Sequence, residues 1–158
     1  MRSSILIVNA ASTLAMTGLI WLVQLLHYPS FSFVCESNFA KFAVFHQQRI
    51  SIVVVPLMLF ELISTLLLLH RPHVAFPARL AIAGAICLGI AWFSTFLLQV
   101  PVHQQLVKGQ DGGLVAELVA GNWVRTAAWS ARAVLICVAL QRCAAAAQSN
   151  PNPHHVTA

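Results

Sequence analysis

Charged side chains are scarce in this chain of 158 residues. Asp, Glu, Lys and Arg make up only 8% of it, whereas 59% of its residues are hydrophobic. Soluble domains carry about 25% charged residues, so this chain has too little polar surface to cover a water-soluble globule. The composition therefore excludes a soluble binding module and predicts a single integral membrane domain, residues 1–143.

Two further absences narrow the function. The four cysteines show no CxxC spacing, which argues against a disulfide framework and against a thiolate zinc site. The basic residues stand singly, with no cluster and no interleaved aromatic residues. The net charge of +5 therefore does not indicate a nucleic-acid-binding protein.

Four apolar segments are present instead. They cover residues 5–26, 50–69, 80–98 and 124–141, and each has about the 20 residues that a bilayer-spanning helix requires. The first begins like a secretory signal, but its apolar run is too long for one, so we expect a membrane helix there. Residues 144–158 contain two Asn-Pro pairs and few bulky apolar residues, which predicts a disordered tail.

An even number of spans places both termini on one side of the membrane. The basic residues are balanced between the two sides, but those at the chain start and in the short second loop weigh more. We therefore expect a multi-pass protein of the cell (inner) membrane with cytoplasmic termini. Of the two long outer loops, the first has helical apolar spacing, at the interface or leading into the second span. The other resumes a helical pattern from Leu114, so the last helix is expected to begin there.

Polar residues recur at helical spacing in or beside every span. A polar stripe facing lipid would be costly, so the stripes are expected to face each other. This predicts an all-α fold, a four-transmembrane-helix bundle with a polar cavity opening on the outer side. The cavity is expected to narrow toward Glu61 and Arg132. Its expected lining is His27, His46, Arg49, Gln99, His103, Asn122 and Arg125.

Glu61 and Arg132 are charged residues at similar depth near the middle of their spans. Three readings are open. The two side chains could form an ion pair that joins two helices, since isolated charges at this depth are expensive. The same pair could serve as a proton or substrate site. Alternatively, Glu61 could be neutral while Arg132 reaches elsewhere.

Three histidines, His27, His46 and His103, are expected at one depth on separate helices. They could be interfacial residues that hydrogen-bond to loops and headgroups. They could instead hold a transition metal such as copper, iron or zinc, because imidazoles from different helices are the usual ligands in a bundle. Haem ligation by two of them is a further alternative.

The last third of the chain resembles a known family. The stretches QVPVHQQL and NWVRTAAWSARAVL resemble the anthrone oxygenase-like family of small membrane proteins. That family has a polar-x-Pro-x-polar motif at the end of its third helix and an Asn-x-x-Arg-Thr motif at the start of its fourth. The positions that match are Gln99, Pro101, His103, Asn122, Arg125 and Thr126. Gln99 and His103 stand where asparagines are frequent in the family, and His27 and His46 look like an additional histidine set.

The resemblance implies a four-helix membrane fold with a polar outer pocket and oxygen-dependent oxidation of a phenolic or quinol-like compound. In the resulting hypothesis, the three histidines hold a metal. The catalytic residues are Glu61, Arg132 and Arg125. An aromatic ligand binds beside other polar and aromatic side chains. The expected substrate-binding residues are Gln99, Asn122, Trp123, Trp129, Tyr28 and Arg49.

Two other classes of function remain open at this stage. A non-catalytic membrane subunit would use the polar stripes only to pack its own helices together. It would assemble with a protein partner or with a second copy of the chain. A small transporter or proton channel through the level of Glu61 and Arg132 is less favoured, because nothing marks discontinuous helices or inverted repeats.

Overall fold

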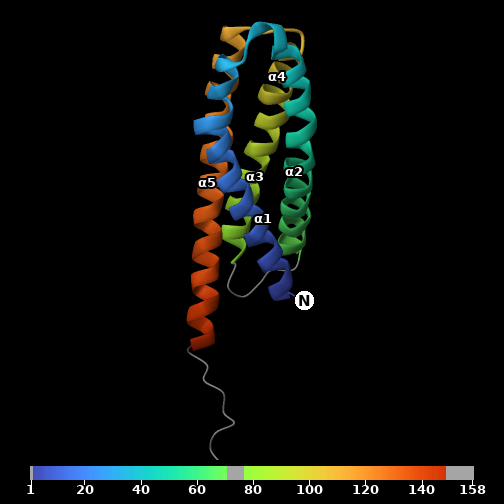
Figure 1. The fold of residues 1–158 in the computed structure, drawn as a ribbon. Coiled ribbons are helices and arrows are strands. Elements are labelled where there is room, and N and C mark those ends of the chain that lie inside the picture. The colour runs from blue at the N-terminus through green and yellow to red at the C-terminus, as the bar shows by residue number, and fades with distance from the viewer. Residues whose placement is uncertain (1, 71–76, 149–158) are drawn as a thin grey trace, which may run out of the picture.

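The computed structural model describes residues 2–70 and 77–148, and every regular element in these ranges is a helix. Four helical rods run side by side along one direction (Figure 1). The predicted all-α four-helix bundle is therefore confirmed. The rods Ser3–Phe33, Glu36–His70, Ala78–Leu106 and Gly112–Ala146 are each long and apolar enough to cross a membrane, which is the build of a multi-pass membrane protein.

The first rod is made of three elements. Helix α1 spans Arg2–Leu22, a π-helical turn η1 spans Val23–His27, and a 3₁₀ turn η2 spans Pro29–Phe33. Helix α2, Glu36–His70, then returns as the second rod. Because η2 is compact, it closes the bundle at the end that we call the outer end.

The second half of the chain repeats this arrangement of a long helix and a modified turn. Helix α3 spans Ala78–Ser94, a π-helical turn η3 spans Thr95–Gln99, and helix α4 spans Val100–Leu106. Helix α5, Gly112–Gln148, forms the last rod. The N-terminus and the last turn of α5 lie at the same end of the bundle, opposite the outer end (Figure 1).

The helices extend beyond the apolar segments of the sequence. Helix α2 begins at Glu36 and α5 at Gly112, so both predicted loop helices are confirmed as parts of the long rods. At about 1.5 Å per residue, the 35 residues of α2 exceed the ~30 Å thickness of a hydrocarbon core. Residues 144–148 were expected in a disordered tail but continue α5; the rest of that tail lies outside the described residues.

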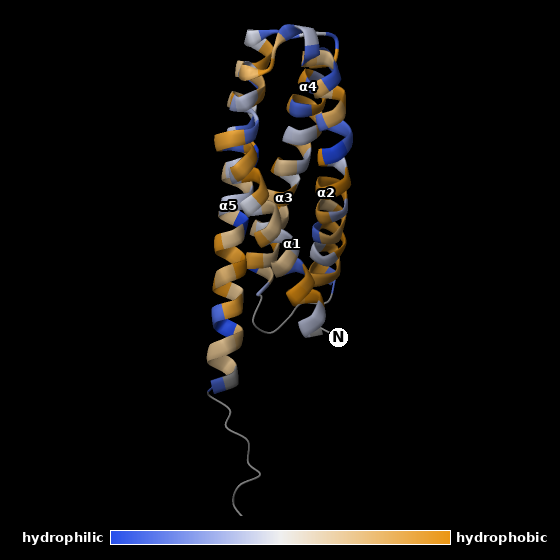
Figure 2. Ribbon diagram, in the orientation of Figure 1, coloured by the Kyte–Doolittle hydropathy of each residue, from blue (hydrophilic) through white to orange (hydrophobic). Residues whose placement is uncertain are grey.

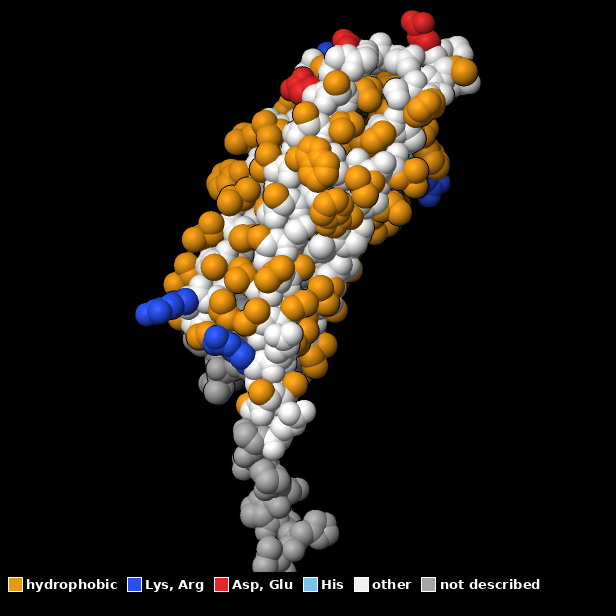
Figure 3. Space-filling model, turned by 90° about the vertical axis from the view of Figure 1, so that its left-hand side faces the viewer, with side chains coloured by type: hydrophobic (Ala, Val, Ile, Leu, Met, Phe, Trp, Pro, Cys, Tyr) orange, Lys and Arg blue, Asp and Glu red, His pale blue; other side chains and the backbone are white. Residues whose placement is uncertain are grey.

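Apolar side chains cover the flanks of the bundle. Figure 2 shows hydrophobic residues along all the long helices, with more polar residues toward the outer end. In Figure 3, acidic side chains appear only toward the outer end of the face shown, whereas basic ones appear both near the opposite end and in the outer half. Large apolar residues such as Ile52, Phe93 and Val134 are exposed by 64%, 70% and 64%. In a bilayer these surfaces contact lipid, as a membrane-embedded bundle requires.

Within the part of the chain that the structure describes, the buried interior has two apolar clusters with a polar layer between them. The outer cluster includes Met16, Met58 and Trp129, whereas the inner cluster includes Leu68 and Ile136. The polar layer consists of buried side chains, and except for Thr65 they belong to the predicted stripes or lie beside one, so this part of the stripes faces inward. Its members are Asn9, Thr13, Glu61, Ser64, Thr65 and Arg132.

The two π-helical turns lie near the outer end, and each is followed by a proline. The Tyr28 N–H donates to the Val23 carbonyl at 2.9 Å, a bond across five residues. Pro29 and Pro101 have no N–H, so the carbonyls four residues before them lose their α-helical donor. The wider turn accommodates this loss, and the rod continues through Pro101 to Leu106 rather than ending there.

Candidate functional site

A cavity of about 230 Å³ lies between α2 and the rod formed by α3, η3 and α4. Its wall is mainly apolar, and it lies between two neighbouring helices of the outer half of the bundle rather than along the bundle axis. It therefore differs from the predicted polar cavity. The α2 side of the wall is formed by Gln47, Ile50, Ser51, Val54, Val55 and Met58.

The opposite wall carries more polar side chains than the α2 wall. It includes the π-helical turn η3, which widens the helix at this level. The residues of this wall are Trp92, Thr95, Phe96, Gln99, Val100 and His103. Tyr28 and Arg125 complete the lining from the first and last rods. Four predicted site residues, Tyr28, Gln99, His103 and Arg125, are thus brought together in one cavity.

Three of the lining side chains have a buried polar atom with no hydrogen-bond partner among the described residues. These atoms are Trp92 Nε1, Gln99 Oε1 and Arg125 Nε. Most buried polar groups in proteins are paired, so such a group calls for a physical explanation. All three of these side chains belong to the lining of this one cavity.

A chain of polar contacts runs from His103 to Arg125 through Tyr28. The Tyr28 hydroxyl lies 3.1 Å from His103 Nε2, and Arg125 Nη1 donates to the same hydroxyl at 3.5 Å. Arg125 also lies over the ring of Trp129, at 5.4 Å from the centroid. Arg125 is thus held by an aromatic ring and one long hydrogen bond.

His27 and His46 contact each other instead of sharing a ligand. Nε2 of His27 lies 2.6 Å from Nδ1 of His46, a hydrogen-bond distance that requires one ring to donate and the other to accept. Two nitrogens on one tetrahedral metal, each about 2.0 Å from it, would be ~3.3 Å apart. A haem between the two rings would separate them further.

The histidine set therefore does not fit the predicted metal centre. His103 is engaged with Tyr28, and its ring centroid lies 5.3 Å from that of His46. No group of three His, Cys, Asp or Glu side chains in residues 2–70 and 77–148 is arranged to hold a metal ion. The predicted copper, iron or haem cofactor gains no support from this geometry.

Three predicted substrate-binding residues lie away from the cavity. Arg49 is exposed on the other side of α2, where it covers the Phe45 ring at 5.4 Å. Trp123 is exposed by 48% and packs edge-on against Trp21, with 5.8 Å between centroids. Asn122 is buried and donates to the Gln24 side-chain oxygen at 2.8 Å.

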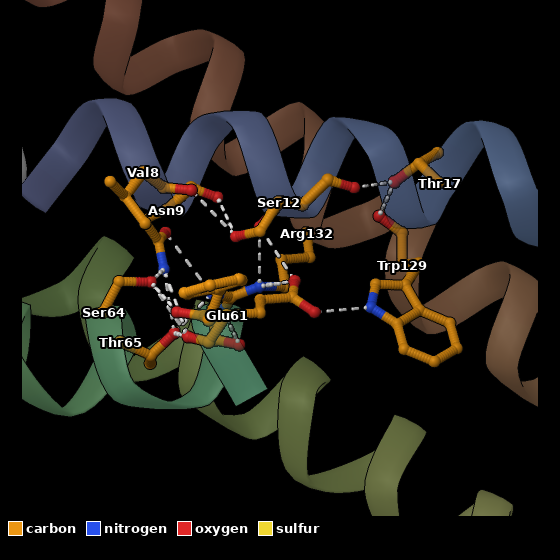
Figure 4. A network of polar contacts seen from close by, with 12 residues as sticks. Val8, Asn9, Ser12, Thr17, Glu61, Ser64, Thr65, Trp129 and Arg132 are labelled. Atoms are coloured by element: carbon orange, nitrogen blue, oxygen red, sulfur yellow. Dashed lines mark hydrogen bonds and ion pairs between the residues drawn. The ribbon is translucent and has the colours of Figure 1, made fainter. Parts of the chain in front are cut away.

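Glu61 and Arg132 form the predicted ion pair at the centre of the bundle. Arg132 Nε lies 2.6 Å from Glu61 Oε1, and the side chains are 2% and 0% exposed (Figure 4). Thr13 donates to Oε1 at 2.8 Å, and Trp129 Nε1 donates to Oε2 at 2.9 Å. Both carboxylate oxygens are therefore occupied, and Trp129 serves this network rather than the cavity.

The remaining nitrogens of Arg132 are paired as well. Nη1 donates to the Gly84 carbonyl at 2.5 Å, and Nη2 donates to Thr65 Oγ1 at 2.5 Å and to Asn9 Oδ1 at 3.3 Å. The network thus joins α1, α2, α3 and α5 (Figure 4). With every charged atom satisfied and neither residue lining the cavity, this arrangement favours the structural interpretation over a proton or substrate site.

Sequence reasoning missed two kinds of functional residue. Gln47 and Ser51 line the cavity and stand four residues apart on α2, so a wider search for helical polar pairs could have found them. Gly84 contributes a backbone carbonyl to Arg132. Every residue has such a carbonyl, so the sequence holds no signal for this contact.

No family model, curated protein or solved structure matches this chain. What the cavity can bind therefore has to follow from its own residues.

Proposed function

We propose that this protein binds a membrane-soluble phenol- or quinol-like compound in the cavity between α2 and α3–α4 and oxidises it. One observation carries the proposal: Trp92, Gln99 and Arg125, each with one buried polar atom that has no hydrogen-bond partner within the described ranges, line a cavity whose remaining wall is mainly apolar. Small-molecule sites commonly combine apolar walls with a few orienting polar groups. A ring with hydroxyl or carbonyl oxygens could pair with all three.

The oxidation step is supported by the resemblance of the QVPVHQQL and NWVRT stretches to the anthrone oxygenase-like family, which implies molecular oxygen as the oxidant. In the balanced reaction a quinol loses two electrons and two protons to become the quinone, and oxygen takes them up to leave as hydrogen peroxide. Oxidation of a phenol or quinol releases protons, and imidazole is the side chain that most often accepts them. His103 lines the cavity. In this proposal His103 accepts the hydroxyl proton, while Gln99 and Arg125 orient the ring oxygen.

The proposal contains no metal-bound step, because His27 and His46 are hydrogen-bonded to each other. Glu61 and Arg132 also have no role in it, since their network is complete without a ligand. The catalytic roles predicted from the sequence for these two residues are therefore replaced by a structural one.

Binding can be tested with a decyl-substituted benzoquinol and its quinone, added to the protein in lipid nanodiscs. We expect saturable quenching of tryptophan fluorescence, because Trp92 lines the cavity. The quenching should largely disappear in Trp92→Phe and persist in Trp123→Phe, whose ring lies on the exposed surface. Quenching that never saturates, with equal loss of signal in both variants, would exclude binding in this cavity.

Oxidation can be followed by quinol absorbance together with oxygen uptake. Replacing a proton-accepting side chain typically slows turnover by about 10²–10⁴-fold, so His103→Gln should reduce kcat by that order and leave quinol affinity within a few-fold. His70→Gln is the matched control, because His70 is the last residue of α2, at the end away from the cavity. Equal rates in the two variants would refute the role of His103.

A second candidate function is that of a non-catalytic membrane subunit. The observation in its favour is the polar network of Glu61 and Arg132, which joins the helices and needs no ligand. Polar side chains serve as such helix contacts in many membrane proteins. A protein that neither binds nor oxidises the quinol, but purifies with one partner at constant stoichiometry, would favour this function.

A further inference from the structure

The two arginines of α5 that lie inside the bundle have very different surroundings. Arg132 has partners on all three guanidinium nitrogens, including Glu61. Arg125 lies two helical turns away and is equally buried, at 5% exposure against 2%. Within residues 2–70 and 77–148, its Nε has no partner, and its one hydrogen bond is the 3.5 Å contact with Tyr28. A guanidinium remains charged inside proteins, so Arg125 is a buried cation without a counter-charge.

The chain holds no acid that could neutralise Arg125. It has four acidic residues in all, and each of them lies in the described ranges. Glu61 is paired with Arg132, and the three others are exposed. Those three are Glu36, Asp111 and Glu117.

Removing a charge from water is costly unless an opposite charge or a full set of hydrogen bonds compensates it. The Trp129 ring compensates Arg125 only in part. The open space next to Arg125 is the cavity that it lines with Gln99 and His103. The missing counter-charge therefore has room at one place, where a ligand would bind.

We propose that the cavity binds its ligand as an anion, with one ionised oxygen group against Arg125 and an apolar body between α2 and η3. This inference rests on the proposed function and specifies the form that its substrate takes once His103 has accepted the hydroxyl proton, a phenolate or a related ring oxyanion. The carboxylate of a membrane fatty acid has the same chemistry and is the alternative source. Apolar residues such as Val54, Val55 and Phe96 form the wall for the body of either molecule.

The first experiment compares matched charged and neutral probes in phosphatidylcholine nanodiscs at pH 8.5. The charged ring probe is 4-decyl-2-nitrophenol, whose hydroxyl is ionised there, and its methyl ether is the neutral partner. Decanoate and decanol form the second pair. We expect the phenolate to bind at least about tenfold more tightly than its ether, because one charge-assisted hydrogen bond separates them. Arg125→Gln should abolish this difference, and Lys108→Gln, at an exposed position of the outer end, should preserve it.

Each outcome separates this inference from the proposed function. Equal, saturable binding of phenol and ether would overturn the anion and leave the quinol-binding function intact. No saturable binding of either ring probe would overturn both. Tighter binding of decanoate than of the phenolate would support an anion site and identify a membrane fatty acid as its occupant.

A stability measurement provides an independent check without any ligand. An unpaired buried charge does not stabilise the fold, so Arg125→Gln should unfold at the same temperature as the wild type or higher. Arg132→Gln should unfold well below both, because it leaves Glu61 without its cation. A large loss of stability in Arg125→Gln would overturn the inference, since it would show that the protein itself already satisfies this guanidinium.

Discussion

Glu61 lies at 0% exposure with both carboxylate oxygens bonded, so its removal reveals what a central ion pair contributes. Glu61→Gln leaves Arg132 buried without its counter-charge. We expect it to reduce the free energy of unfolding by about 3–5 kcal/mol. Thermal unfolding in detergent measures the change, and Glu36→Gln, at an exposed acid, should alter stability by less than about 0.5 kcal/mol.

The double variant Glu61→Gln/Arg132→Met distinguishes the cost of an unpaired buried charge from the cost of disturbed packing. Replacing a buried ion pair by uncharged side chains of similar size is often neutral or stabilising, so the double variant should recover most of the stability lost in Glu61→Gln. A double variant as unstable as the single one would show that the network acts through geometry rather than charge.

Gly84 provides a second test at the residue scale. A Cβ atom there would lie 3.0 Å from Arg132 Nη1, whereas one at Gly89 would meet nothing within 4 Å. We expect Gly84→Ala to lower stability by about 1–3 kcal/mol through overpacking. Gly89→Ala should be neutral or stabilise the helix by up to ~1 kcal/mol. Equal effects at the two positions would contradict the close approach of Arg132 to α3.

The ion pair could be predicted because the spans contain very few charged residues. The second span has one acid, Glu61, and the last span has Arg132 at similar depth, so burial cost alone brings them together. The His27–His46 contact was not predictable in the same way. It depends on ring orientation within a few tenths of an ångström, and helical spacing places side chains only to a face of the helix.

At the scale of elements, the π-helical turns decide which side chains reach the cavity. An extra residue in a turn rotates everything after it by about 100° relative to an α-helix. Turn η3, Thr95–Gln99, thereby sets the facing of Gln99 relative to Trp92. Prolines were visible in the sequence, but a proline can end a helix, bend it or widen one turn, and neighbouring packing selects among these outcomes.

Pro101 can be tested directly. In Pro101→Ala, the new N–H can donate to the Leu97 carbonyl, which favours an ordinary α-helical turn in place of η3. Gln99 would then turn relative to the cavity. We expect the benzoquinol to bind about tenfold more weakly, the worth of one good hydrogen bond, with unchanged helical content by circular dichroism. Pro56→Ala, whose proline α2 accommodates without interruption, is the control and should bind normally.

At the scale of the whole molecule, the basic residues at the two ends of the bundle predict its orientation in the membrane. The basic residues near the chain start weigh most in the positive-inside rule, so the outer end should face away from the cytoplasm. In a cysteine-free background, Asp111→Cys should react with a membrane-impermeant maleimide in intact cells, and Ala144→Cys only after lysis. The reverse labelling pattern would invert the orientation.

The overall fold was the most predictable part of this protein. The scarcity of charged residues indicated lipid as the surrounding medium, and the length of the apolar runs indicated four spans. The polar stripes indicated which helix faces meet. The cavity was not predictable at this level. Its place between α2 and η3 depends on how far two neighbouring helices separate, a distance that no spacing in the sequence encodes. Sequence reasoning therefore named Gln99, His103 and Arg125 correctly as neighbours but placed Arg49 with them.

The central ion pair has a consequence for how the chain is made. Glu61 and Arg132 are separated by 71 positions in the sequence. At a synthesis rate of ~5–20 residues per second, Arg132 leaves the ribosome about 4–14 s after Glu61. During that interval the acid of α2 is without its cation. Of the side chains of α1 already made, Thr13 donates to the Glu61 carboxylate, whereas Asn9 donates to the Glu61 backbone carbonyl. We therefore expect the Thr13 hydroxyl to be the first α1 partner of the Glu61 carboxylate during insertion, before Arg132 completes the network.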